Sequence, residues 1–99
     1  MVHVKREGIL LEKTDLAFEN EGVMNPAIMS EGETIHLFYR AVREGNHSTI
    51  GYCRLEGPLQ PVYRDEKPLL YPEFDYESQG VEDPRIVKIE DFYYMTYSL

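Results

Sequence analysis

The stretch Gly80-Val81-Glu82-Asp83-Pro84-Arg85 decides the fold of this chain, because a related stretch, Gly22-Val23-Met24-Asn25-Pro26-Ala27, occurs earlier. When Asn25 is aligned with Asp83, the two copies lie 58 residues apart. In both copies a Gly-Val turn leads to a polar residue and a proline. An apolar strand, a charged turn and an aromatic strand then follow. Such a repeat indicates one supersecondary unit used twice, each copy unable to bury its apolar face alone.

The match between the two copies continues beyond the prolines. The further aligned pairs are apolar or aromatic: Ile28 with Ile86, Met29 with Val87, Ile35 with Tyr93, Leu37 with Met95, and Tyr39 with Tyr97. If the units are successive blades around an axis, Asn25 and Asp83 occupy equivalent places beside one central cavity. A polar site at the axis is therefore the leading functional hypothesis.

Strand patterns fill most of the chain, and no convincing helix is present; residues 16–21 hold one helical turn at most. Residues 67–79 contain two prolines, three aromatic residues and three acids, and they fit neither a helical nor a strand period. They predict an ordered loop of the kind that often carries function. The expected strands are 9–12 (an opening or closing strand), 27–30, 34–42, 48–55, 59–63, 85–90 and 92–98.

These elements predict an all-β fold that comprises the first one and a half blades of a β-propeller. The first blade spans about residues 22–66 and the start of the second about 80–99, within one partial domain, 1–99, with no second domain. The second unit stops before its third strand, which leaves sheet edges of the kind that natural domains avoid. We therefore expect the N-terminal part of a larger protein, inactive by itself and prone to associate through its exposed strands.

Composition narrows the class of function. The net charge of −8 argues against nucleic acid as a partner, since that binding relies on clustered Lys and Arg. No apolar run is long enough to cross a membrane, and the first residues lack the layout of a secretory signal. Cys53 is the only cysteine, and its place in an alternating strand pattern predicts a buried structural residue. These features favour a cytoplasmic protein, although a periplasmic or exported protein could begin in the same way once processed.

No cofactor or metal site is expected. His36 and His47 do not stand at metal-ligand spacing with any cysteine, and the chain has no glycine-rich phosphate loop, serine elbow or CxxC motif.

Asp83, Asn25 and two arginines are the candidate functional residues. Asp83 stands at the mouth of a strand between charges of both signs, Glu82 and Arg85, and a carboxyl group so placed can act as a general acid. Alternatively, Asp83 and Asn25 only cap turns by binding backbone amides. Arg40 and Arg43 offer planar forks that suit phosphate, carboxylate or vicinal hydroxyls; the alternative is a surface ion pair with nearby glutamates.

Several motifs together resemble the β-mannoside phosphorylases and mannosidases of glycoside hydrolase family 130. They are Asn25-Pro26-Ala27, Tyr39-Arg40-Ala41, the segment 80–86 and Tyr93-Tyr94-Met95-Thr96-Tyr97. The element Glu82-Asp83-Pro84-Arg85 is the most specific of them. The resemblance runs from about Gly22 to Leu99. Many members of the family have a Ser-x-Asp-Gly-like turn after the third strand, whereas this chain has Arg54-Leu55-Glu56-Gly57-Pro58 there. The difference bears on the subfamily more than on the fold.

This resemblance implies a five-bladed β-propeller whose active site lies in the central cavity. Members of the family cleave β-mannosidic bonds with inversion, most with inorganic phosphate, giving α-mannose 1-phosphate, and some with water. By position, Asp83 corresponds to the proton donor, acting through a sugar hydroxyl, and Asn25 and Arg40 correspond to residues that hold the mannose ring. Arg43 and Arg85 are further candidates for a contact with sugar or phosphate. An inverting reaction with phosphate needs one protein carboxylate and basic residues opposite it.

The resemblance implies a β-mannoside oligosaccharide as partner and inorganic phosphate as co-substrate, with neither nucleic acid nor membrane as partner; a homo-oligomer is compatible with it. Two alternatives remain open. The first is a water-using β-mannosidase of the same family. The second is a non-catalytic carbohydrate-binding propeller, in which Tyr71, Phe74 and Tyr76 form a sugar platform and Asp83 is a turn cap.

Overall fold

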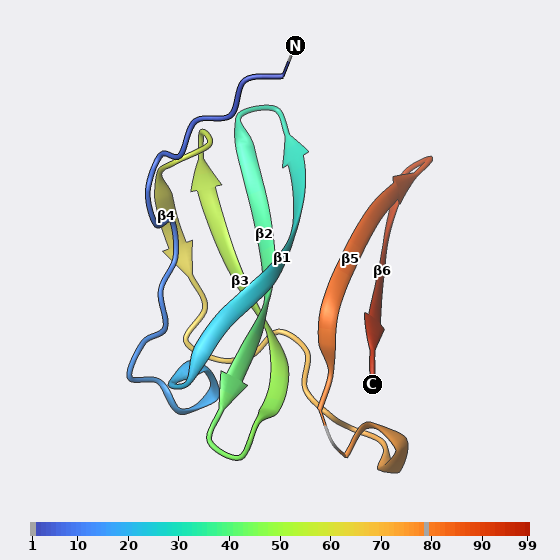
Figure 1. The fold of residues 1–99 in the computed structure, drawn as a ribbon. Helices are drawn as coiled ribbons and strands as arrows, with labels where there is room; N and C mark the ends of the chain where they lie inside the picture. Colours follow the sequence, from blue (N-terminus) through green and yellow to red (C-terminus); the bar gives the residue numbers. More distant parts are fainter. Residues whose placement is uncertain (1, 79) are drawn as a thin grey trace.

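The computed structural model describes residues 2–78 and 80–99 and shows an all-β chain (Figure 1). Two sheets lie side by side, one of four strands and one of two, and two single turns of 3₁₀ helix lie outside them. The four-stranded sheet consists of β1 (Gly22–Glu31), β2 (Thr34–Arg43), β3 (His47–Glu56) and β4 (Pro61–Arg64), and the two-stranded sheet of β5 (Glu82–Ile89) and β6 (Phe92–Ser98). The 3₁₀ turns are η1 (Ala17–Glu19) and η2 (Asp75–Glu77).

The four-stranded sheet is an antiparallel meander in chain order, as in one propeller blade. Tight turns join its first three strands, and residues that adopt positive φ stand at them: Gly32 at +62° between β1 and β2, and Asn46 at +59° between β2 and β3. The β5–β6 hairpin repeats the β1–β2 hairpin, so the chain contains one blade and the first half of the next.

The segment that joins the two sheets is held at both of its ends by β3. The Leu70 carbonyl accepts a hydrogen bond of 2.9 Å from the Ile50 N–H, and the Val81 N–H donates one of 2.9 Å to the Ser48 carbonyl. Gly80 lies so close to β3 that a Cβ atom there would come within 2.8 Å of the Ser48 nitrogen. Glycine is therefore needed where the chain passes from one blade to the next.

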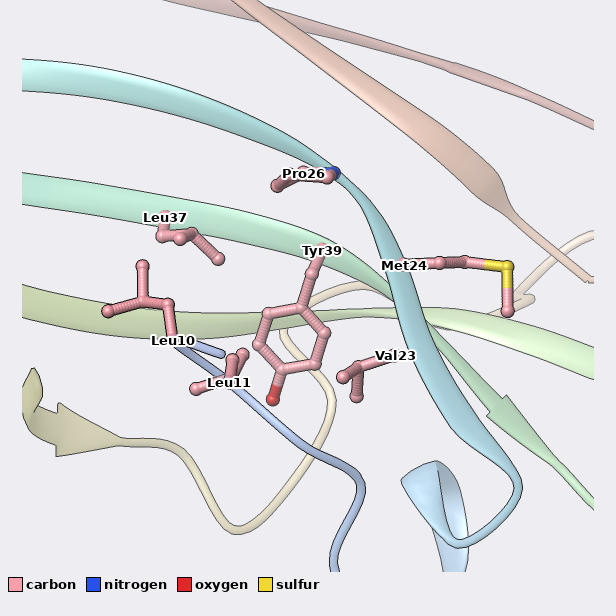
Figure 2. A pocket seen from close by; sticks show the side chains of 7 residues that line it. All are labelled: Leu10, Leu11, Val23, Met24, Pro26, Leu37 and Tyr39. Atoms are coloured by element: carbon pink, nitrogen blue, oxygen red, sulfur yellow. The ribbon is translucent and has the colours of Figure 1, made fainter. Parts of the chain in front are cut away.

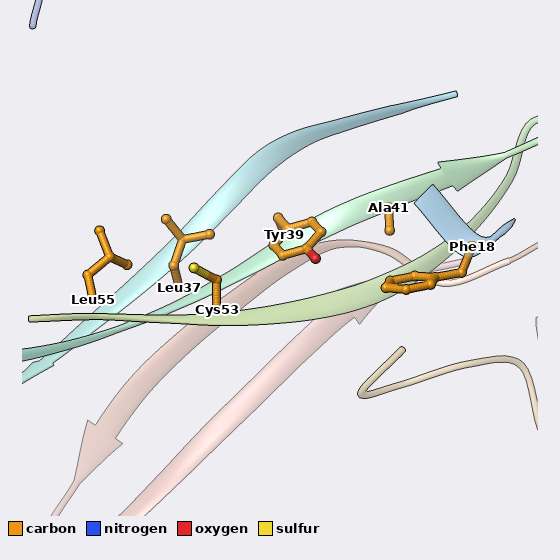
Figure 3. Close-up of a cluster of buried hydrophobic side chains, with 6 residues drawn as sticks. All are labelled: Phe18, Leu37, Tyr39, Ala41, Cys53 and Leu55. Atoms are coloured by element: carbon orange, nitrogen blue, oxygen red, sulfur yellow. The ribbon is translucent and has the colours of Figure 1, made fainter. Parts of the chain in front are cut away.

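Each face of the four-stranded sheet is covered by a different part of the chain. One face carries a cluster of buried side chains packed under η1 and the N-terminal segment (Figure 3). The members of this cluster are Phe18, Leu37, Tyr39, Ala41, Cys53 and Leu55. The opposite face packs on the second sheet through Phe38 and Ile50. Val81, directly before β5, and Ile86 and Met95 of the β5–β6 hairpin lie against them.

A buried polar network fixes η1 to the sheet. The Glu19 carboxylate is fully buried and lies 2.7 Å from the Arg64 guanidinium of β4. It also accepts hydrogen bonds of 2.6 Å from the hydroxyls of Tyr39 and Thr14. The Tyr39 ring lies over Gly51, where a Cβ atom would stand 2.3 Å from the ring, so only glycine fits there. A buried carboxylate is tolerated only with such full pairing.

The prediction of a strand at residues 9–12 is wrong. These residues are irregular and pair with no described strand, although Leu10 and Leu11 pack on the sheet and the Glu12 carbonyl accepts a hydrogen bond of 2.7 Å from Arg64. Their apolar character thus reflects packing and not strand pairing. β1 is also longer than expected, because Gly22 and Val23 are part of the strand and not of a turn before it.

Candidate functional site

The two halves of the sequence repeat give the same backbone irregularity in β1 and β5. Each strand carries a bulge just where the polar residue precedes proline: the pairing of β1 with β2 shifts between Met24 and Ala27, and that of β5 with β6 between Glu82 and Arg85. Within the bulges Asn25 and Asp83 adopt the left-handed conformation, with φ of +50° and +52°. Asn and Asp tolerate that conformation better than other residues with side chains. Bulges often redirect a side chain beside a functional site.

The matching bulges bring Asn25 and Asp83 together. The Asn25 Nδ2 atom donates a hydrogen bond of 2.7 Å to Asp83 Oδ1. Both residues line a pocket of about 330 Å³ together with Pro26, Pro84 and Arg85; we call it the Asp83 pocket. Among the residues that the structure describes, neither side chain binds a backbone amide, so the turn-cap alternative has no support in these contacts.

Arg40 does not line the Asp83 pocket but is held by two partners, one of which is the residue before Asp83. In the pairing of β1 with β2, Arg40 lies opposite Met24, the last paired residue of β1 before the bulge at Asn25. Its Nε atom donates a hydrogen bond of 2.7 Å to Ser48 Oγ, and its Nη2 atom lies 2.9 Å from Glu82 Oε2. The Arg40 and Glu82 side chains are largely shielded, so their ion pair is worth more than one at a free surface. The contacts fix the Arg40 guanidinium beside Glu82, the residue that precedes Asp83 in β5.

Arg43 is separated from the other candidates. It is exposed at the end of β2 and lines a second pocket, of about 470 Å³, which we call the Tyr71 pocket. His47, Thr49 and Tyr71 also form part of its wall. The structure therefore brings together Asn25, Asp83 and Arg85, joins Arg40 to Glu82, the neighbour of Asp83 in sequence, and leaves Arg43 outside the group.

The three aromatic residues of the alternative sugar platform do not form one surface. Phe74 and Tyr76 are exposed and stack on each other, with ring centroids 5.3 Å apart and planes inclined by 4°. Tyr71 lies apart from them in the wall of the Tyr71 pocket.

Other features of the described residues offer no comparable site. A pocket of about 220 Å³ under the N-terminal segment is lined by apolar side chains, with Leu10 and Leu11 facing Leu37 and Tyr39 (Figure 2). Burial raises the pKa of the Cys53 thiol, so this cysteine is a structural residue and not a nucleophile, as its strand pattern predicts.

Residues 2–78 and 80–99 contain no group of three His, Cys, Asp or Glu side chains that could hold a metal ion. Nor does any helix in that part of the chain have the length and apolar character to cross a membrane.

The sequence alone does not identify two residues of this region as functional contributors. It marks Glu82 only as a charged neighbour of Asp83, yet Glu82 binds Arg40 from the other blade. It marks Ser48 only as part of a strand, yet the Ser48 side chain is buried and holds Arg40 in place. A buried serine in a strand that also contains Ile50 has no distinctive sequence pattern, so only the packing of the two sheets reveals its role.

Comparison with known proteins identifies relatives of this chain. Residues 6–99 match the family Glyco_hydro_130, described as beta-1,4-mannooligosaccharide phosphorylase. Two relatives from Thermoanaerobacter sp. (strain X514) align with 99% of this chain: a beta-1,2-mannobiose phosphorylase at 36% identity and a 1,2-beta-oligomannan phosphorylase at 34% identity. The chain spans only about a third of either relative, 36% of its length.

A solved structure has the same fold. The crystal structure of a candidate glycoside hydrolase from Parabacteroides distasonis ATCC 8503 superposes with a TM-score of 0.66 and 28% sequence identity. The match covers 87% of this chain and 30% of that protein.

Proposed function

The chain belongs to glycoside hydrolase family 130, and we propose that the complete protein cleaves β-mannosides with inorganic phosphate, giving α-mannose 1-phosphate. In this reaction a phosphate oxygen forms a bond to the anomeric carbon, and the bond from that carbon to the glycosidic oxygen breaks. The leaving oxygen takes a proton from Asp83, relayed by a sugar hydroxyl. The proposal needs phosphate as a co-substrate and no other cofactor.

The observation that carries the proposal is the contact between Asn25 and Asp83. Two bulges, one from each repeat, direct the Asn25 amide and the Asp83 carboxylate toward the same pocket, where a hydrogen bond of 2.7 Å joins them. The amide fixes one oxygen of the Asp83 carboxyl group. In the described residues no side chain binds the other oxygen, which we assign to proton transfer. A general acid has to be held within hydrogen-bonding reach of the group that takes its proton.

The arginines supply the second part of the proposed chemistry. A guanidinium has five N–H donors, and the contacts of Arg40 with Ser48 and Glu82 leave donors for the hydroxyls of a mannose ring. Arg85 lines the same pocket as Asp83 and can contact sugar or phosphate. Further basic residues that hold phosphate opposite Asp83 are assigned to parts of the complete protein outside this chain.

The test is the Asp83→Asn variant of the complete protein. Because Asn cannot donate the proton, we expect release of mannose 1-phosphate from β-mannobiose to fall at least about 100-fold, while the folded structure is kept. Asp91→Asn, which changes an exposed carboxylate in the β5–β6 turn, is the matched control and should keep full activity.

The products decide between the alternatives. Mannose 1-phosphate formed only when phosphate is present supports phosphorolysis. Free mannose formed at the same rate without phosphate would assign water as the nucleophile and overturn that part of the proposal. Unchanged turnover in Asp83→Asn would overturn the role of Asp83.

A further inference from the structure

The Tyr71 pocket is a second hollow on the same end of the molecule as the Asp83 pocket. It is lined by residues of η1, of the adjoining ends of β2 and β3 and of the loop before η2. The turn between β2 and β3 lies at the lower end of Figure 1. β1 and β5 also begin at this end, and Asn25 and Asp83 stand near their first residues. With about 470 Å³, the pocket has the size of small-molecule sites, which measure about 300–1,000 Å³.

The wall of the Tyr71 pocket carries side chains of the kinds that bind neutral sugars: an aromatic ring and hydrogen-bonding groups. The Tyr71 ring is about half exposed (53%) and offers an apolar face with a polar tip. Arg43 and His47 come from the turn opposite and provide N–H groups for hydroxyls. The Thr49 hydroxyl is buried and has no hydrogen-bond partner among the described residues, so the wall of the pocket contains an unsatisfied polar group.

The loop that presents Tyr71 is firmly anchored. Leu70, the preceding residue, is hydrogen-bonded to Ile50 of β3. Farther along, Glu77 is buried and accepts hydrogen bonds from the Tyr97 hydroxyl of β6 and the Glu73 backbone N–H. An exposed aromatic side chain on an anchored loop is pre-organised, which reduces the entropy lost when it binds a ligand.

A short chain of contacts connects the two pockets. Ser48 forms part of the wall of the Tyr71 pocket, and its hydroxyl accepts the hydrogen bond of Arg40. Arg40 in turn pairs with Glu82, the neighbour of Asp83 in sequence.

We propose that the Tyr71 pocket is a remote subsite that binds a mannosyl unit of an oligosaccharide whose scissile bond lies at Asp83. The proposal rests on the proposed function and extends it, because it predicts a preference for oligosaccharides over the disaccharide. Tyr71 stacks on the remote sugar ring, and Arg43, His47 and Thr49 bind its hydroxyls. Arg43 thus contacts sugar in this pocket and not at the cleaved bond.

The test compares Tyr71→Ala with Tyr76→Ala in the complete protein, with β-mannooligosaccharides of two to four units as substrates. Tyr76 is the matched control, because it is an exposed aromatic residue of the same loop that does not line the pocket. We expect Tyr71→Ala to raise KM for the longest substrate about fivefold to tenfold and to leave the disaccharide within about twofold. Tyr76→Ala should change neither value.

The outcomes separate failure of the subsite from failure of the proposed function. If the unsubstituted protein cleaves mannosides but Tyr71→Ala affects all chain lengths equally, or none, the subsite is wrong and the enzyme assignment stands. If the unsubstituted protein cleaves no mannoside, the proposed function fails. Titration calorimetry with the mannotetraose then decides the subsite: weaker binding by Tyr71→Ala supports it, and equal binding by both proteins overturns it.

Discussion

At the scale of single residues, Ser48 connects the two blades in two ways. Its backbone carbonyl accepts the Val81 N–H, which places the start of the strand that carries Asp83. Its hydroxyl holds Arg40, which pairs with Glu82 of that strand. A buried serine with these contacts is a positioning residue: it sets where the Arg40 guanidinium and the Glu82 carboxylate lie.

Ser48→Ala tests this role. The change leaves Arg40 Nε without its acceptor, and a hydrogen bond to a charged group contributes about 1.5–3 kcal/mol. If Arg40 loses its position, KM for β-mannobiose in the complete protein should rise about tenfold, which corresponds to about 1.4 kcal/mol. The unfolding temperature should fall by only a few degrees.

The matched control for Ser48→Ala is Ser30→Ala, at an exposed position of β1, which should change neither quantity. An unchanged KM together with a lowered unfolding temperature would show that Ser48 stabilises the fold and does not position Arg40.

At the scale of the elements, the sequence pattern predicts what depends on local order and misses what depends on packing between elements. The strands of both hairpins follow from alternating apolar residues and turn signals, and the closeness of Asn25 and Asp83 follows from the repeat. The irregular segment 9–12 is apolar for another reason, since it covers one face of the sheet. The separation of Arg43 from Arg40 follows from the strand itself, since residues three apart on β2 point to opposite faces of the sheet. That the loop before η2 forms a pocket with Arg43 depends on where this loop packs, which has no local signature.

η2 is the element whose attachment should depend on pH. Hydrogen bonds from the Tyr97 hydroxyl and the Glu73 backbone N–H hold the pKa of Glu77 below its ordinary value of 4.5. A lowered folded-state pKa contributes stability that is present above the ordinary value and is lost as pH falls through the folded-state value. The same bond raises the pKa of Tyr97, and that contribution is present below about pH 10 and lost as pH rises further.

We therefore expect Glu77→Gln to flatten the loss of stability below about pH 4.5, measured as the urea midpoint of the complete protein across the acid range. Glu44→Gln, at an exposed turn, is the control and should keep the acid dependence of the unsubstituted protein. If the urea midpoint falls equally steeply with decreasing pH in all three proteins, the Glu77 contact does not control the acid dependence of stability.

At the scale of the whole molecule, one face of the β5–β6 hairpin is apolar and uncovered. Val87 pairs with Tyr94, and Ile89 with Phe92, so these four side chains lie on the same face. Each of them is at least half exposed, from 51% for Tyr94 to 67% for Phe92. In a propeller the next sheet packs on such a face, and the relatives are long enough to provide one, since this chain spans 36% of their length.

A polypeptide of residues 1–99 should consequently associate with itself, because exposed apolar faces and free strand edges drive association. We expect its sedimentation coefficient to rise with protein concentration, and the double substitution Val87→Lys with Phe92→Lys to suppress that rise. Val2→Lys with Val4→Lys adds the same charge at side chains of the N-terminal segment that are 87% exposed, so it separates loss of the apolar face from a general effect of charge. Suppression by both double substitutions would assign the association to charge, and a monomer at every concentration would show that the exposed face is not adhesive. Suppression by the hairpin pair alone would identify this face as the surface through which the polypeptide associates.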